Sequence, residues 1–269
     1  MESLFDHARA CIAVRVPDEK VALTRELASA WRAGRFSLTA SRPAEPIAIP
    51  GRPEKPELVH PSRVKRRKLT TPLGQAAFLH ALVHIEFNAI NLAWDAVYRF
   101  RDLPADFYND WINVAEDESL HFQLLSRRLQ ETGHHYGDFP AHNGLWEMAC
   151  KTAHDVLLRM ALVPRVLEAR GLDVTPGMIS RLQQAGDAHS ATILGRILDD
   201  EIGHVLAGSR WFRYVCRQRK LDPDATFARL LRQHLPGHNS VPLNPAARTK
   251  AGFSQVELAM LGSSAGAGA

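Results

Sequence analysis

The feature that most constrains this chain is a pattern of carboxylates and histidines that occurs twice. In each copy an isolated Glu is followed by the Glu of an Asp-Glu-x-x-His segment, 32 residues later in the first copy and 33 in the second. On a helix, residues three apart project from the same face, about one turn apart. The pattern supplies six candidate metal ligands: Glu86, Glu118, His121, Glu168, Glu201 and His204.

The sequence around these residues predicts four long helices. Apolar residues at helical spacing indicate helices over residues 73–100, 105–132, 144–170 and 176–219, and each candidate Glu lies within an apolar stripe. A carboxylate on a buried helix face is costly unless it is paired or binds a metal. Four helices that each offer a Glu, two of them with a His one turn on, are typical of a dinuclear site in a helix bundle. We therefore predict an all-α, ferritin-like four-helix bundle.

The ligand types favour iron or manganese. Four carboxylates neutralise most of the charge of two first-row ions, and one imidazole per ion completes a mixed oxygen and nitrogen set. We predict two iron ions, two manganese ions or a mixed pair as the cofactor. Asp117 and Asp200 are placed to accept hydrogen bonds from the ligating imidazoles. In an alternative interpretation, arginines such as Arg165 or Arg196 neutralise the buried carboxylates.

The rest of the chain completes a predicted division into three parts. Residues 1–72 are expected to form two helices and a proline-rich extended wrap, and residues 73–220 form the bundle. Residues 221–269 are expected to form one short helix, over residues 223–234, and a flexible tail. The loop over residues 133–143 is long enough to serve as the crossover that a ferritin-like topology requires.

A proline and two glycines lie beside the candidate ligands. Pro164 precedes Glu168 by one turn and is expected to kink or locally widen the third helix. The distortion either opens space for a small molecule or is simply tolerated. Gly203 and Gly208 flank the ligands of the fourth helix, where the missing side chains leave room.

Composition points to a soluble, cytoplasmic protein. The amino terminus lacks a basic start followed by an apolar stretch, and no apolar run approaches the ~20 residues that span a bilayer. The three cysteines are far apart and are expected to be reduced. A net charge of +4 permits a polyanionic partner without requiring one. The basic run over residues 63–68 is either a polyanion-binding patch or a solvated stretch of the wrap.

Several runs of residues resemble a bacterial ferritin-like family, the domain of unknown function four-five-five. These runs are His84-Ile85-Glu86, Asp117 to Phe122, Leu167 to Asp173, Asp200 to Val205, Tyr136 to His142 and Ala251 to Ser254. The resemblance implies a ferritin-like bundle with a dinuclear site whose ligands fall on the same six positions. A more distant likeness is to the di-iron tRNA hydroxylase that acts on a modified adenosine, by analogy of ligand pattern and basic character.

These observations favour an oxygen-activating oxidoreductase, a hydroxylase or oxidase of unknown substrate. No flavin or nicotinamide fingerprint is evident, so an electron-transfer partner is expected to reduce the metals. One alternative is a ferroxidase or metal-handling protein without an organic substrate. Another is an RNA-modifying hydroxylase, which rests on the basic run. We expect a monomer or small homo-oligomer without a membrane partner.

Overall fold

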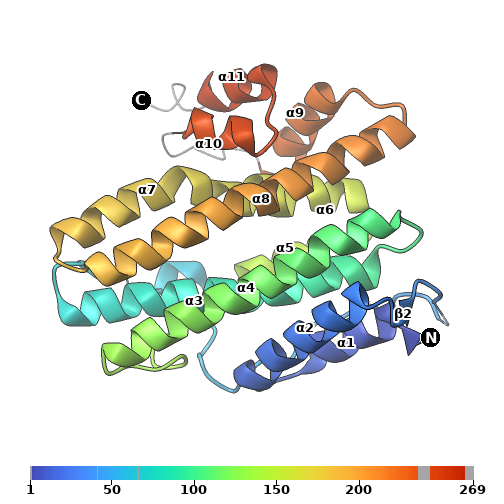
Figure 1. Ribbon diagram of the computed structural model, residues 1–269. Coiled ribbons are helices and arrows are strands. Elements are labelled where there is room, and N and C mark those ends of the chain that lie inside the picture. Colours follow the sequence, from blue (N-terminus) through green and yellow to red (C-terminus); the bar gives the residue numbers. More distant parts are fainter. Residues whose placement is uncertain (1, 41, 66, 236–242, 264–269) are drawn as a thin grey trace. The chain divides into compact units, whose positions relative to one another are not determined.

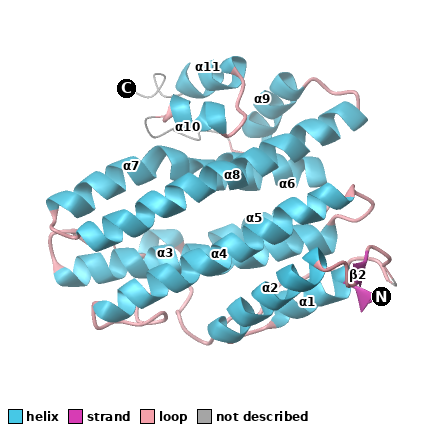
Figure 2. Ribbon diagram, in the orientation of Figure 1, coloured by secondary structure: helices cyan, strands magenta, loops and turns pink. Residues whose placement is uncertain are grey.

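The computed structural model describes residues 2–40, 42–65, 67–235 and 243–263, and most of this part of the chain is helical (Figure 1). Two short strands, β1 (Glu2–Ser3) and β2 (Phe36–Ser37), pair in parallel (Figure 2). The contacts divide the chain into two compact units, residues 1–151 and 152–269. The all-α prediction is confirmed. The predicted three-part division is a different partition and stays a prediction.

The first unit is built around one pair of long helices. Its helices are α1 (Leu4–Ala13), α2 (Pro17–Arg32), α3 (Pro72–Arg99), α4 (Ala105–Glu131) and α5 (Gly144–Lys151), with a 3-10 turn, η1, at Pro61–Arg63. α3 packs along α4, α1 and α5 pack on α3, and α2 packs on α4. The N-terminal helices therefore cover the helix pair that carries the first group of candidate ligands.

Local signals explain why α3 and α4 begin and end where predicted. Thr71 accepts a hydrogen bond from the backbone N–H of Gly74, which satisfies a free donor at the start of α3. Pro72 occupies the first turn, where its missing N–H costs nothing. Gly133 follows α4 with φ of +79°, a left-handed conformation that ends helices and that glycine adopts without strain. The two predicted helices of this pair are confirmed to within one residue.

A buried lysine fixes α2 against α3. Lys20 Nζ donates to the carbonyls of Cys11 and Ile12 at 2.8 and 3.0 Å and to Asn91 Oδ1 at 2.7 Å. All three ammonium protons therefore have acceptors. Burial still lowers the pKa of Lys20 to about 8, because the charged form loses its hydration.

The proline-rich wrap is mainly irregular, as expected, and is tied to the loop that follows α4. Val59 N–H donates to the carbonyl of Ala141, and Ala141 N–H donates to the carbonyl of Glu57. Trp146 of α5 donates its indole N–H to the carbonyl of Ala48. Within the first unit, the loop over residues 133–143 thus pairs with the wrap.

The second unit departs from two predicted helix boundaries. Its elements are α6 (Val156–Leu162), the π-helix η2 (Val163–Glu168), α7 (Ala169–Gln184), α8 (Ala188–Gln218), α9 (Pro223–His234), α10 (Pro245–Lys250) and α11 (Gln255–Ser263). α8 packs against α6, η2 and α7. The prediction of one helix over 144–170 is wrong, because Asp155 caps a new helix by accepting from Leu157 N–H. The predicted start of the fourth helix at 176 is also wrong, because Asp187 caps α8.

The C-terminal part holds more structure than the sequence predicted. The helix over 223–234 is confirmed as α9, but α10 and α11 were not foreseen. The predicted flexible tail lies largely outside the described residues.

Pro164 widens the helix locally, as predicted. Proline lacks the N–H that an α-helix requires, and the chain forms a π-helix from Val163 to Glu168. Pro164 packs against the backbone of α8 at Gly208. A Cβ atom at position 208 would lie 2.4 Å from Cβ and Cγ of Pro164. Gly208 therefore serves close packing against the π-helix.

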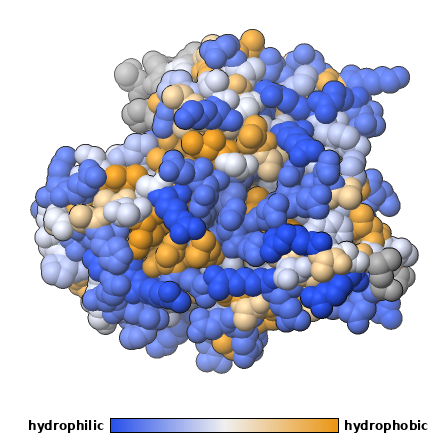
Figure 3. Space-filling model, viewed as in Figure 1, coloured by the Kyte–Doolittle hydropathy of each residue, from blue (hydrophilic) through white to orange (hydrophobic). Residues whose placement is uncertain are grey.

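α3 has the length and composition of a membrane-spanning helix, contrary to the expectation that no apolar stretch of the chain is long enough to span a bilayer. In its most apolar stretch of 18 residues, 67% is buried inside the protein, as in the core helix of a folded domain. Hydrophilic side chains cover much of the face in Figure 3, and apolar residues gather there in separate patches. Absence of a membrane partner stays a prediction.

Replacing Gly208 by Ala should destabilise the protein by about 1–3 kcal/mol, because the new methyl group overlaps the ring of Pro164. Gly195→Ala on the same helix is the matched control. A Cβ at position 195 meets no atom within 4 Å, so this change should stabilise the helix by about 0.5–1 kcal/mol. Urea denaturation followed by circular dichroism measures both. Equal effects of the two changes would contradict the packing described for Pro164.

Candidate metal centre

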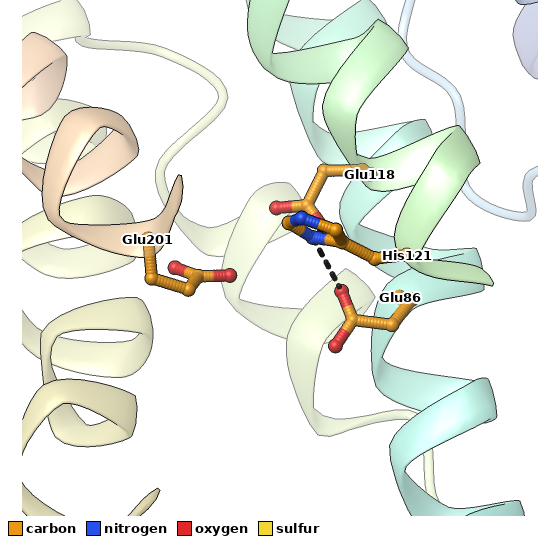
Figure 4. Close-up of side chains that lie close together, drawn as sticks. All are labelled: Glu86, Glu118, His121 and Glu201. Atoms are coloured by element: carbon orange, nitrogen blue, oxygen red, sulfur yellow. Dashed lines mark hydrogen bonds and ion pairs between the residues drawn. The ribbon is translucent and has the colours of Figure 1, made fainter. Parts of the chain in front are cut away.

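In the first unit, α3 and α4 bring two glutamates and one histidine together. The Nδ1 atom of His121 lies 3.4 Å from Glu118 Oε2 and 3.7 Å from Glu86 Oε2. Each of the three residues offers a ligand atom within 4.8 Å of those of the others. Figure 4 shows the two carboxylates pointing toward the imidazole from neighbouring helices. The sequence predicted all three as ligands.

Helix register produces this convergence. Glu118 and His121 are three residues apart on α4, so one turn separates them on a single face. Glu86 lies in the middle of α3, between the buried residues Val83 and Ile90. Since α3 and α4 pack side by side, their inward faces meet at these positions.

The cluster is buried, and burial governs its electrostatics. Glu118 is 1% exposed and His121 is 0% exposed. Burial, together with the nearby charge of Glu118, raises the pKa of Glu86 well above its usual value. Burial would lower the pKa of His121, but the carboxylates of Glu118 and Glu86 raise it to about 11. In the metal-free protein, the imidazole therefore carries a proton that is held between two carboxylates.

In the second unit, α8 repeats the Glu-x-x-His arrangement. His204 Nδ1 lies 3.7 Å from Glu201 Oε1, close to the corresponding distance in the first unit. Glu201 is also labelled in Figure 4. Glu168, the third predicted ligand of this unit, is the last residue of the π-helix and is half-buried. Among the described residues of this unit, Glu168, Glu201 and His204 do not form a group with ligand atoms within 4.8 Å.

The two arginines considered as alternative partners have other neighbours. Arg165 Nη2 lies 2.7 Å from Glu257 Oε2, and both side chains are fully buried. Arg196 is exposed, and its Nε lies 3.9 Å from Asp200 Oδ2. Asp117 and Asp200 are half-buried, and their predicted bonds to the imidazoles stay predictions.

A second group of histidines holds the loop after α4 against α3. His84 is buried and lies 2.9 Å from the Tyr136 hydroxyl through Nδ1 and 3.0 Å from the carbonyl of His142 through Nε2. His80 Nε2 accepts from the backbone N–H of Gly137. The contact with the carbonyl makes Nε2 of His84 the donor, so its Nδ1 accepts from Tyr136. No local sequence pattern indicates this pairing, since His84 and Tyr136 are far apart in the chain.

Three histidines of the loop over residues 133–143 make structural contacts. His142 Nδ1 accepts from the backbone N–H of Gly144, at the start of α5. His134 Nδ1 lies 3.6 Å from Asp138, and His135 donates its backbone N–H to the same carboxylate. The basic run is solvent-exposed at Arg63, Lys65, Arg67 and Lys68, whereas Arg66 lies outside the described residues.

These features define a helical protein with a possible buried carboxylate and histidine metal site. The chain belongs to the family described as "Protein of unknown function (DUF455)", whose sequence profile matches residues 13–259. The family resemblance noted in the sequence is thereby confirmed. The chain is also 49% identical over 213 residues to an "Uncharacterized protein" of Haemophilus influenzae, covering 77% of this chain and 74% of the relative. No solved structure matches the chain.

Raising the pH should destabilise the metal-free protein through His121. The ordinary pKa of 6.5 applies to the unfolded chain and about 11 to the folded one, so the folded state retains an extra proton between these values. Its stabilising effect is complete below the unfolded pKa and is lost as the pH rises through the folded pKa. The raised pKa of Glu86 acts in the same direction. We expect the free energy of unfolding to fall by at least about 1 kcal/mol between about pH 7 and pH 9.5.

Urea denaturation of the metal-free protein across this range measures the effect. His121→Gln should flatten the pH dependence, whereas His189→Gln, a change at an exposed histidine, should preserve it. An unchanged dependence in His121→Gln would show that another group carries the proton.

Proposed function

We propose that this protein binds two ions of iron or manganese and acts as an oxygen-activating oxidoreductase, a hydroxylase or oxidase. The observation that carries the proposal is the burial of Glu86 and Glu118 around His121. Two carboxylates in one desolvated site repel each other, and a cation relieves that repulsion. The mixed oxygen and nitrogen ligand set suits iron and manganese.

We further propose that the two Glu-x-x-His pairs belong to one dinuclear centre. Glu201, Glu168 and His204 would join the first cluster, so that each ion has one imidazole ligand. Two observations support this. The preceding Glu stands 32 or 33 residues before each pair in the sequence. The histidine-to-carboxylate distances are also similar in the two units, at 3.4 and 3.7 Å.

The atoms of the first cluster fit a cation. Glu86 Oε2 is buried and accepts no hydrogen bond from the described residues, although it lies 3.7 Å from His121. A buried carboxylate oxygen without a hydrogen bond is costly, and a metal ion in contact with it would remove that cost. Metal uptake must displace the proton of His121, so the affinity should increase with pH.

When bound, the ions would supply the electrons and coordination positions needed to activate oxygen. The chain's own residues hold the ions and exclude water. Buried apolar side chains, among them Val83, Ile90 and Leu125, line the helix faces that carry the ligands. Asp117 and Asp200 would orient the imidazoles by accepting their N–H groups, which is how second-layer carboxylates commonly fix a ligand.

Metal content tests the site directly. Wild-type protein, reconstituted without oxygen, should hold about two iron or manganese ions per chain, in line with a di-metal carboxylate site. Glu118→Ala and Glu201→Ala should each reduce this content sharply, because each removes a carboxylate ligand. Elemental mass spectrometry measures the stoichiometry.

Glu116→Ala is the matched control for this series. Glu116 lies two residues before Glu118 on the same helix but pairs with Arg32 at 2.7 Å. Its loss should leave the metal content unchanged. A loss confined to Glu118→Ala would restrict the site to the first unit, and a wild type without stoichiometric metal would refute the proposal.

Oxygen reactivity tests the activity. The fully reduced, metal-loaded protein should consume oxygen, with spectral changes visible in a stopped-flow instrument. Glu118→Ala should lose this reaction, and Glu116→Ala should retain it. Failure of the loaded wild type to react with oxygen would contradict an oxygen-activating role even if two ions bind.

Two alternatives concern the substrate of the same site. RNA is suggested by the exposed basic residues of the wrap and by the distant likeness to the tRNA hydroxylase. Oxygen consumption that RNA stimulates, and that serine substitutions at Arg63, Lys65, Arg67 and Lys68 abolish, would favour it. A ferroxidase would instead turn over excess ferrous iron without an organic substrate, and a storage protein would form a large shell detectable by light scattering.

A further inference from the structure

A buried arginine in the π-helix connects this segment to the C-terminal helices. Arg165 is 0% exposed, and its Nη2 forms an ion pair of 2.7 Å with Glu257 of α11. Its Nε donates to Ser209 Oγ of α8 at 3.2 Å. Burying an arginine costs free energy unless a nearby negative charge neutralises the guanidinium. Separating Arg165 from Glu257 would leave a buried charge without its partner, so the folded state favours the paired arrangement.

Three aromatic rings enclose the same guanidinium. The centroids of Phe212, Phe227 and Phe253 lie 4.7, 4.2 and 4.6 Å from Arg165 Cζ. These rings come from α8, from α9 and from the turn before α11. Planar guanidinium groups stack favourably on aromatic faces, which a lysine would not reproduce. Separate C-terminal segments therefore converge on one side chain of the π-helix.

Glu257 is itself held in place by a capping box. Ser254 Oγ accepts from Glu257 N–H at 3.1 Å, and Glu257 Oε2 accepts from Ser254 N–H at 2.9 Å. Ser254 Oγ also lies 2.9 Å from Asp224 of α9. The capping box therefore orients the carboxylate that faces Arg165.

The π-helix ends at Glu168, one of the proposed ligands. A π-helix is less stable than an α-helix and occurs where the surrounding structure maintains it. Relaxation to an α-helix would shift the register by one residue and turn the following side chains by about 100°. Such a turn would direct Glu168 away from its present position. Pro164, packed against Gly208, and Arg165, paired with Glu257, are the contacts that oppose it.

We propose that the ion pair between Arg165 and Glu257 is a positioning device. Through it, the C-terminal helix α11 holds the π-helix in register and fixes the orientation of Glu168, which the proposed function makes a metal ligand. This inference rests on the proposed function, because Glu168 is a metal ligand only if the chain binds metal. Arg165 and Glu257 are positioning residues and do not contact the metals.

The chain offers a matched control pair. Arg248 of α10 forms an ion pair of 2.6 Å with Asp173 of α7, and both side chains are nearly buried. This pair also ties a C-terminal helix to α7. Arg248 Nη2 donates to the carbonyl of Ala169 at 3.4 Å as well, but neither Arg248 nor Asp173 belongs to the π-helix or pairs with Arg165. Loss of either charge should lower stability, whereas only the pair at Arg165 should affect Glu168.

The experiment compares Glu257→Gln with Asp173→Asn. Glutamine can keep the capping box, so Glu257→Gln removes the charge with little change of shape. Competition with a chelator measures manganese affinity, and hydrogen exchange of the metal-free protein measures protection of residues 163–168. Glu257→Gln should weaken binding of at least one ion by about 10–100-fold and lower protection in the π-helix. Asp173→Asn should leave both as in the wild type.

The outcomes separate this inference from the proposed function. A wild type that binds no manganese or iron overturns both. A wild type that binds metal, with unchanged affinity or unchanged exchange in Glu257→Gln, overturns the positioning role alone. If Glu257→Gln does not fold, Arg165→Met combined with Glu257→Leu removes both charges and should restore stability. Wild-type metal affinity in this folded double variant would also overturn the inference.

Discussion

The interaction on which this structure depends is the burial of two carboxylates beside one histidine. Glu86 and Glu118 lose their hydration inside a helix pair, and the proton of His121 offsets part of that cost in the metal-free protein. The apolar residues around them cannot do so, since they offer no hydrogen bonds. The packing of α3 on α4 thus brings together groups that are stable only with a shared positive charge. The folded state therefore needs a bound proton or metal ion at this site to stabilise the two carboxylates.

The π-helix is a second constraint, and it follows from one residue. Pro164 has no N–H to donate to an α-helical hydrogen bond, and the chain forms a π-helix at this point. Because a π-helix is wider than an α-helix, neighbouring residues must pack against the wider turn. Gly208 provides space on one side, and Arg165 reaches a cage of aromatic rings and a carboxylate. A proline that would otherwise break the helix is accommodated because α8, α9 and α11 supply matching contacts. The C-terminal helices are therefore tied to the segment that carries Glu168.

The sequence predicted those parts of the fold that depend on neighbours within one helix. α3 and α4 follow from long apolar stripes bounded by proline and a capping residue, and the three candidate ligands of the first cluster follow from their register. The boundaries in the second unit failed for an identifiable reason. The predicted third helix ended at residue 170, before Gly171, and the predicted fourth helix began at residue 176, yet α7 runs from Ala169 to Gln184 across both boundaries. The helices instead begin after Asp155 and Asp187, whose side chains accept hydrogen bonds from the first turn of the helix that follows. An Asp in a sequence can cap a helix or simply face solvent, so the sequence alone does not distinguish the two roles.

The difference between contacts within one helix and contacts between distant residues also explains why a site is easier to predict than its surroundings. A Glu-x-x-His pair needs only three residues of regular helix, so the errors in helix ends leave Glu201 and His204 correctly paired on α8. The partners of Arg165 come from residues 44 to 92 positions further along the chain, and no local pattern indicates them. Local sequence patterns thus indicate the candidate ligands, whereas the orientation of these side chains depends on tertiary contacts. The shape of a substrate site depends on those contacts as well, which is why the ligand pattern indicates a class of chemistry before it indicates a substrate.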